Sequence, residues 1–138
     1  MNKLYKITKK RVKVNSDSIP AHIEILGNKE LVRLCLTNII DNAVKYCSEQ
    51  GKIEISLNQK DQHIHCIITD DGDGFYDEKL KNLFMLFSTI GEHKDNSPGL
   101  IFPLLKLIME AHEGVIEVSN LDVGGAKIEL RFPTSRQN

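Results

Sequence analysis

The sequence has no tryptophan, only three cysteines, and no hydrophobic run long enough to cross a membrane. No CxxC pair and no histidine–cysteine cluster with zinc-finger spacing occurs, which excludes a disulfide framework and a zinc finger. Cys35, Cys47 and Cys66 each lie among apolar residues, which predicts buried, reduced thiols in a cytoplasmic protein. The basic N-terminus is followed by no apolar core, so no secretory signal is predicted.

Basic and acidic residues are also nearly equal in number. The 18 basic and 19 acidic residues give a formal net charge of −1, whereas general nucleic-acid binders carry a basic excess. With 41% hydrophobic and 27% charged residues, the 138-residue chain has the composition of a globular protein. We therefore expect no nucleic-acid partner and no membrane contact by this segment. We expect one domain over residues 1–138, with 1–20 as an N-terminal extension or edge strand.

The apolar pattern predicts an α+β fold, a two-layer α/β sandwich whose mixed β-sheet is covered on one face by helices. Helices are indicated by apolar residues at three- and four-residue spacing, and strands by alternation. The expected elements are a weak strand at 22–26, a helix at 28–47, a hairpin at 52–69, a short helix at 77–87, a helix at 100–112, and strands at 115–119 and 126–132.

Four polar residues share one side of the first predicted helix: Asn38, Asn42, Lys45 and Tyr46. Two amide oxygens one turn apart can bind a hard cation such as Mg²⁺. The lysine can reach a phosphate, and the tyrosine ring can stack on a base. On its own, this segment is equally well explained as a solvated polar face of an amphipathic helix.

A second polar motif, DDGDGF at 70–75, follows the expected hairpin. Glycines at alternate positions let the backbone approach a ligand closely. The Asp70 carboxylate at the strand end can accept a hydrogen bond from an exocyclic amine such as that of adenine. A tight turn rich in Asp and Gly is the alternative interpretation. The spacing does not match an EF-hand, which argues against a calcium loop.

In this order, the NxxxNAxKY helix, the hairpin and DxGxG resemble the ATP-binding catalytic domain of sensor histidine kinases, within the GHKL ATPase superfamily. The resemblance covers roughly residues 22–133. It implies the Bergerat ATP-binding fold, with ATP and Mg²⁺ as cofactors. The implied roles are magnesium and phosphate binding by Asn38 and Asn42, phosphate contact by Lys45, adenine packing by Tyr46, adenine recognition by Asp70, and pocket shaping by Gly72 and Gly74. Phe75 is also expected to bind the nucleotide.

The resemblance extends past the second motif. Residues 83–87 look like the F box, and 88–98 take the place of a short ATP lid. The glycine-rich box that follows the lid in this family departs here, reading SPGLIF at 97–102. Its core pattern survives at Gly99 and Leu100, which the resemblance assigns to nucleotide binding. Pro98 removes an amide donor, and Ile101 adds a β-branched side chain where amides should meet phosphates.

The implied function is to bind Mg-ATP and donate its γ-phosphate to a histidine on a separate helical dimerisation domain, in the same parent chain or in trans. A response regulator is the expected further partner, the location is cytoplasmic, including the cytoplasmic part of a membrane receptor, and the isolated domain is expected to be a monomer. None of the five histidines lies in an upstream helical phosphoacceptor box, so no catalytic residue is expected within this chain.

Two alternatives remain within the same superfamily. The altered glycine box favours a degenerate GHKL domain, which would act as a non-catalytic module that binds a response regulator or a phosphotransfer domain. An anti-sigma-type serine kinase fits the chain length. That group, however, usually carries an acid at the position of Asn38.

Overall fold

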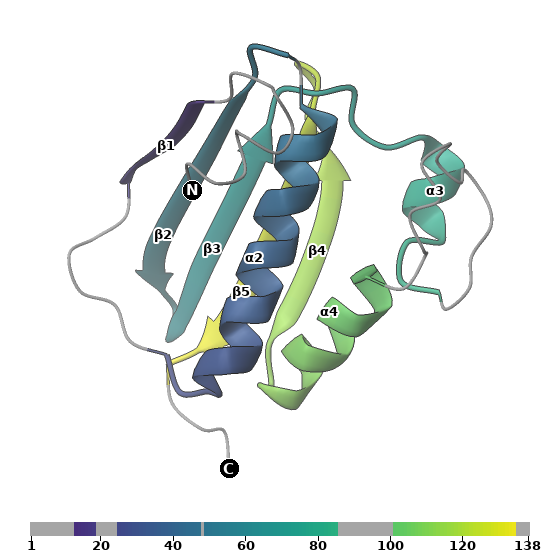
Figure 1. Cartoon of the computed structure of the whole chain (residues 1–138). Coiled ribbons are helices and arrows are strands. Elements are labelled where there is room, and N and C mark those ends of the chain that lie inside the picture. The colour runs from purple at the N-terminus through teal and green to yellow at the C-terminus, as the bar shows by residue number, and fades with distance from the viewer. Residues whose placement is uncertain (1–12, 19–24, 48, 86–100, 135–138) are drawn as a thin grey trace.

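The computed structural model describes residues 13–18, 25–47, 49–85 and 101–134, with 13–18 described through the backbone alone. Within these residues no helix is both long enough and apolar enough to cross a bilayer. The elements in chain order are β1 (Lys13–Ser18), α2 (Lys29–Tyr46), β2 (Lys52–Lys60), β3 (His63–Asp70), α3 (Asp77–Lys81), α4 (Ile101–Ala111), β4 (Val115–Asn120) and β5 (Ala126–Pro133) (Figure 1).

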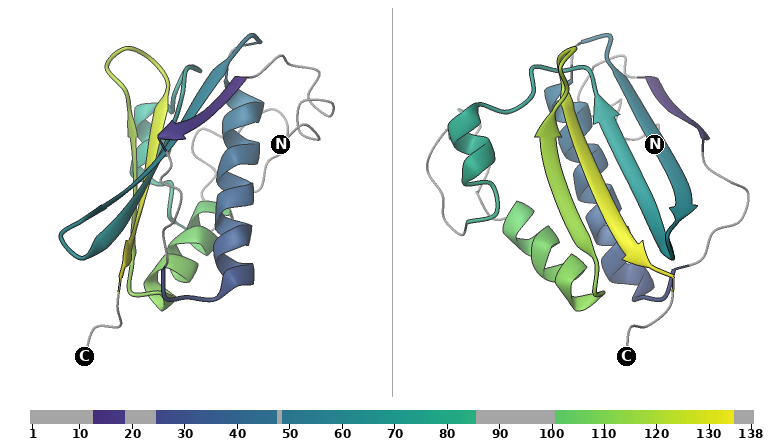
Figure 2. Two further views of the ribbon diagram at one scale, coloured as in Figure 1. Left: turned by 90° about the vertical axis from the view of Figure 1, so that its left-hand side faces the viewer. Right: turned by 180° about the vertical axis from the view of Figure 1, so that it is seen from behind.

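The described strands form one sheet in the order β1-β2-β3-β5-β4. β1 pairs with β2 in parallel, and the other neighbours are antiparallel. The sheet is therefore mixed, and α2 and α4 lie together on one of its faces (Figure 2). This arrangement confirms the predicted two-layer α+β fold class.

Helix α2 begins and packs as its sequence predicts. The Asn28 side chain caps it, because Oδ1 accepts a hydrogen bond from the Leu31 amide at 3.0 Å. Cys35, Ile39 and Val44 recur on one face and are fully buried against the sheet. The chain leaves the helix at Cys47, whose backbone is extended, and turns into β2.

The core lies between the helices and the inward face of the sheet. On β3 the residues Ile64, Cys66 and Ile68 alternate with half-buried neighbours, as strand geometry requires. All three cysteines are buried and free, as predicted. Burial raises the pKa of the Cys66 thiol to about 11, so this thiol stays protonated and unreactive at neutral pH.

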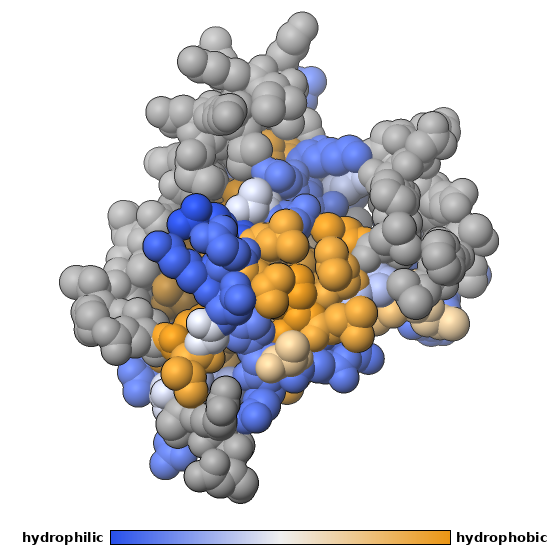
Figure 3. Space-filling view, turned by 60° about the horizontal axis from the view of Figure 1, so that its bottom comes forward, coloured by the Kyte–Doolittle hydropathy of each residue, from blue (hydrophilic) through white to orange (hydrophobic). Residues whose placement is uncertain are grey.

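The helices also expose apolar side chains on the surface. Figure 3 shows apolar residues gathered on the helix side of the molecule. The exposed leucines of α2 and α4 are Leu31, Leu34, Leu104 and Leu107. An apolar surface of this kind is typical of a protein that docks with a partner.

Two predicted elements differ in the structure. Ile25 and Leu26 do not belong to a strand, and residues 22–24 lie outside the described part. The described strand before α2 is β1, which lies at the sheet edge beside β2, within the segment 1–20 that was expected to be an extension or an edge strand. The short helix predicted at 77–87 ends at Lys81, because the Asn82 side chain donates to the Glu78 carbonyl and turns the chain.

Two leucines of α4 that are close in sequence differ strongly in the exposure of their side chains. Leu105 is 1% exposed and Leu107 is 61% exposed. We predict that Leu105→Ala lowers the free energy of unfolding by about 2–5 kcal/mol, because it leaves a cavity in the core. Leu107→Ala is the matched control and should cost less than about 1 kcal/mol. Urea unfolding measures both, and equal losses would contradict the described packing of α4.

Candidate functional site

The two polar motifs meet where α2 and β3 end. A small pocket there is lined by side chains from both motifs and by the start of β5. Its described walls enclose about 30 Å³, space for about one water molecule. The lining residues are Asn42, Tyr46, Asp70, Gly74, Phe75 and Ala126. Residues that are far apart in sequence are thus brought to one place at the upper end of α2 in Figure 1.

Asp70 is the last residue of β3, and the backbone holds its side chain. Its Oδ1 accepts hydrogen bonds from the amides of Gly72 at 2.9 Å and Ala126 at 3.3 Å. No other donor from the described part of the chain reaches this carboxylate, so Oδ2 is the oxygen available to a ligand. The carboxylate therefore has a set orientation at the pocket.

Burial raises the pKa of Asp70 above its ordinary value. The two amide hydrogen bonds oppose this shift, and the neighbouring charge of Asp71 adds to it. Desolvation is the largest of these effects, so the carboxyl group is in a partly dry environment. Such an environment strengthens any hydrogen bond that a ligand makes to it.

Helix α2 contributes its four predicted residues unequally. Asn42 and Tyr46 line the pocket. Asn38 lies one turn earlier and donates its Nδ2 to the Leu34 carbonyl at 2.8 Å. Lys45 is exposed, with Nζ 5.4 Å from the centroid of the Tyr46 ring. Asn38 and Lys45 are therefore near the pocket but are not among its lining residues.

Two glycines of the second motif allow close packing. A Cβ at Gly72 would overlap the Tyr46 carbonyl oxygen, so this glycine lets the loop touch the end of α2. Gly74 has a φ of +77°, and a Cβ there would lie 2.6 Å from Asn120 Oδ1. Both glycines are thus required by the path of the loop between Asp70 and Phe75.

Residues outside the predicted site hold this loop in place. Asn120, at the end of β4, accepts from the Phe75 amide at 2.9 Å and donates to the Phe75 carbonyl at 2.8 Å. Together with the Ala126 amide, it was missed by sequence reasoning. A single Asn and a backbone amide form no recognisable sequence motif. Their role becomes visible only from hydrogen bonds to residues 45 and 56 positions away.

An aromatic series connects the pocket to α4. Phe75 and Phe84 each meet the buried Phe102 edge to face, at centroid distances of 5.9 and 6.2 Å. Leu83 and Phe84, from the segment that resembles the F box, belong to this packing. The remaining predicted site residues, Gly99 and Leu100, and the lid segment 88–98 lie outside the described residues.

A larger pocket of about 370 Å³ lies at the other end of α2. It is bordered by His112, whose Nδ1 donates to the Ile108 carbonyl at 2.8 Å and whose Nε2 accepts from the Asn28 amide at 2.9 Å. Both ring nitrogens are thus used to join the end of α4 to the start of α2. None of the predicted site residues lines this pocket, so its size does not make it the candidate site.

The turn before β5 offers a matched pair of substitutions. Gly124 and Gly125 have φ values of +102° and +99°, but only at Gly125 would a Cβ overlap the Asp70 carbonyl oxygen. We predict that Gly124→Ala costs about 1–2 kcal/mol of unfolding free energy through backbone strain alone. Gly125→Ala should cost at least about 1 kcal/mol more, because β5 must move away from β3. Equal losses in urea unfolding would contradict this close approach.

The raised pKa of Asp70 predicts a pH dependence of stability. In the pH range between the unfolded and the folded pKa, the folded chain binds more protons, so stability falls as pH rises through this range. Asp70→Asn removes the buried charge and should make the chain at least as stable as the wild type near pH 7. This advantage should shrink near pH 4. Urea unfolding at both pH values tests the sign, and a pH-independent difference would contradict it.

Comparison with known proteins identifies the family. Residues 27–136 match the family described as histidine kinase-, DNA gyrase B-, and HSP90-like ATPase. The heme sensor protein HssS of Staphylococcus saprophyticus is 36% identical over 110 residues, which cover 80% of this chain and 24% of that protein. The signal transduction histidine-protein kinase BaeS of Escherichia coli is 29% identical over 122 residues, which cover 86% of this chain and 26% of that protein. The chain spans about a quarter of each relative.

The solved structures agree with this assignment at the level of the fold. The mycobacterial sensor histidine kinase MprB superposes with a TM-score of 0.81 at 20% identity, covering 96% of this chain and 89% of that one. The family match includes both polar motifs and all described elements except β1. The chain therefore belongs to the histidine kinase-, DNA gyrase B- and HSP90-like ATPase family, as an ATP-binding catalytic domain of the sensor histidine kinase type.

Proposed function

We propose that the chain binds Mg-ATP and donates the γ-phosphate to a histidine on a separate helical dimerisation domain, in the same parent chain or in trans. One observation carries this proposal. The Asp70 carboxylate, fixed through Oδ1 by two amides, borders the same pocket as Asn42 and Tyr46. A carboxylate that can accept a hydrogen bond from adenine, an amide that can bind a cation and a ring that can stack on a base thus border one pocket.

Adenine recognition is assigned to Asp70, with Gly72 and Gly74 shaping the pocket. Oδ2 accepts a hydrogen bond from the exocyclic amine of adenine. The Tyr46 and Phe75 rings pack against the base. Since the described walls enclose only about 30 Å³, the pocket must widen to admit a purine.

Magnesium and phosphate binding are assigned to α2. Asn38 uses Nδ2 to bond the Leu34 carbonyl, and this leaves its Oδ1 as the atom that can bind a cation. Asn42, one turn on, has no hydrogen-bond partner for its side chain among the described residues. The two amide oxygens fit the hard-oxygen preference of Mg²⁺, which when bound neutralises charge on the phosphates. Lys45 supplies a further positive charge to them, and Gly99 and Leu100 supply phosphate contacts.

The phosphoacceptor histidine is supplied from outside the described residues. His112 uses both ring nitrogens within the fold, and neither His63 nor His65 lines the pocket. The role of this chain is therefore to position the nucleotide and neutralise its charge for transfer in the cytoplasm. The exposed leucines of α2 and α4 support docking with a partner domain, and a response regulator receives the phosphoryl group afterwards.

A second candidate is a degenerate module that binds a response regulator or phosphotransfer domain without phosphoryl transfer. Ile101 is the first residue of α4, where the family pattern has a glycine that lets amides approach phosphates. Its β-branched side chain favours this second candidate.

Calorimetric titration with Mg-ADP and a non-hydrolysable ATP analogue tests the first proposal. We predict that the wild-type chain binds both, and that chelation of magnesium weakens the binding. Asp70→Asn should lower affinity about 10- to 150-fold, the equivalent of one charge-assisted hydrogen bond. Asp71→Asn, the same change at the exposed neighbour, is the matched control and should bind as the wild type does.

Each result has a distinct meaning. If Asp70→Asn binds as tightly as the wild type, the adenine assignment of Asp70 is wrong. If the folded wild-type chain binds neither nucleotide, the second candidate replaces the first. Circular dichroism of each variant separates a loss of binding from a loss of fold.

A further inference from the structure

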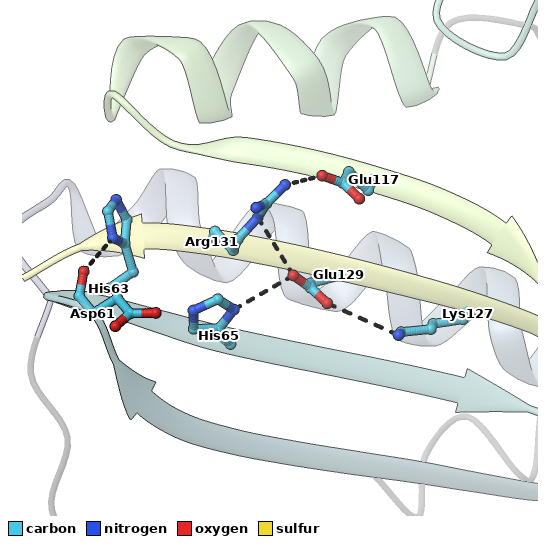
Figure 4. A network of polar contacts seen from close by, with 7 residues as sticks. All are labelled: Asp61, His63, His65, Glu117, Lys127, Glu129 and Arg131. Carbon is cyan, nitrogen blue, oxygen red and sulfur yellow. Dashed lines mark hydrogen bonds and ion pairs between the residues drawn. The ribbon is translucent and has the colours of Figure 1, made fainter.

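Two histidines lie side by side on the face of the sheet that the helices leave uncovered. His63 and His65 are two positions apart on β3, so they project from the same face (Figure 4). Their ring centroids are 6.5 Å apart, with the ring planes at 66°. Nothing in the proposed ATP chemistry uses them.

Hydrogen bonds select the same nitrogen on both rings. His63 Nδ1 lies 2.9 Å from the Asp61 carbonyl oxygen, and His65 Nδ1 lies 3.4 Å from Glu129 Oε2. A carbonyl and a carboxylate only accept hydrogen bonds, so in each case Nδ1 is the donor. In both neutral rings the lone pair is therefore on Nε2, for which the described residues provide no partner.

We propose that His63 and His65 form a binding site for a divalent transition-metal ion such as Zn²⁺ or Ni²⁺, with the two Nε2 atoms as ligands. Imidazole nitrogen suits these metals, whereas Mg²⁺ and Ca²⁺ prefer oxygen. Metal-bound histidines typically donate their other N–H to a backbone carbonyl or a carboxylate, and these two rings already do so.

The site has two protein ligands and is open. No group of three or more His, Cys, Asp or Glu residues clusters within the described part of the chain, so water completes the coordination. With metal–nitrogen bonds of about 2.0–2.1 Å in a tetrahedral site, the two ring centroids would lie about 5 Å apart. Figure 4 shows the free nitrogen of His63 directed away from His65, so the rings must turn toward each other, as well as approach by about 1 Å, for both Nε2 atoms to bind one ion.

The charges around the rings are largely balanced. Glu129 lies between Arg131 Nε at 3.3 Å and Lys127 Nζ at 4.0 Å, and Arg131 also contacts Glu117 (Figure 4). The two cations are thus paired with two carboxylates. Lys60, opposite His63 on β2, is exposed, where water screens its charge. A cation at the two Nε2 atoms therefore meets little net repulsion.

The site is separate from the ATP pocket. His63 and His65 begin β3, whereas Asp70 ends it, five residues beyond His65. At about 3.3 Å per residue, His65 and Asp70 lie roughly 16 Å apart along the strand. Metal binding to the histidines therefore needs neither nucleotide nor Mg²⁺, and it can be measured without them.

Calorimetric titration of the tag-free chain with NiCl₂ and with ZnCl₂ tests the proposal. We expect one ion per chain. His63→Gln and His65→Gln should each weaken binding at least tenfold, or about 1.4 kcal/mol. The double variant His22→Gln/His93→Gln changes the same residue type elsewhere in the chain and should bind as the wild type does.

Imidazole NMR of the wild-type chain gives a readout that depends on no variant. Substoichiometric Ni²⁺ should broaden the ring signals of His63 and His65 first. His112, whose nitrogens are both hydrogen-bonded within the fold, should keep its signal. The proposal is overturned if no saturable binding occurs up to about 1 mM, or if binding survives both single substitutions.

Discussion

The hydrogen bonds to Asp70 Oδ1 are the interaction on which the candidate site depends. They bring the amide of Gly72, just after β3, and the amide of Ala126, at the start of β5, to one oxygen. One carboxylate thus joins a loop to two neighbouring strands. Burial makes its charged form costly, and the two amide hydrogen bonds partly offset this cost.

Close backbone packing completes the same region. Gly72 touches the carbonyl that ends α2, and Gly125 touches the carbonyl of Asp70. Asn120 then bonds both backbone groups of Phe75, which fixes the ring that borders the pocket. The loop after β3 therefore contacts the end of α2, the end of β4 and the start of β5.

Strand β3 carries residues of both proposed sites, at its two opposite ends. Its inward residues form the core, its last residue carries the carboxylate, and its first outward residues are His63 and His65. The network around Glu129 spans β3, β4 and β5 on the outward face. The proposed metal site and the proposed nucleotide site can therefore act independently, although they share a strand.

The sequence alone determined the fold class, helix α2 with its Asn28 cap, and both hairpins, because these follow from local periodicity and capping. It also singled out Asn42, Tyr46, Asp70, Gly74 and Phe75, which the structure brings to one pocket, while their roles in binding remain predictions. The sequence left open whether residues 1–20 form an extension or an edge strand, and pairing with β2 decides this for Lys13–Ser18. The early end of α3 was missed, since a side-chain cap leaves little local pattern. The support of the site by Asn120 and Ala126, and the free Nε2 that His63 and His65 have in common, become visible only once the chain is folded. These facts depend on hydrogen bonds, most of them between residues distant in sequence, which no local pattern encodes.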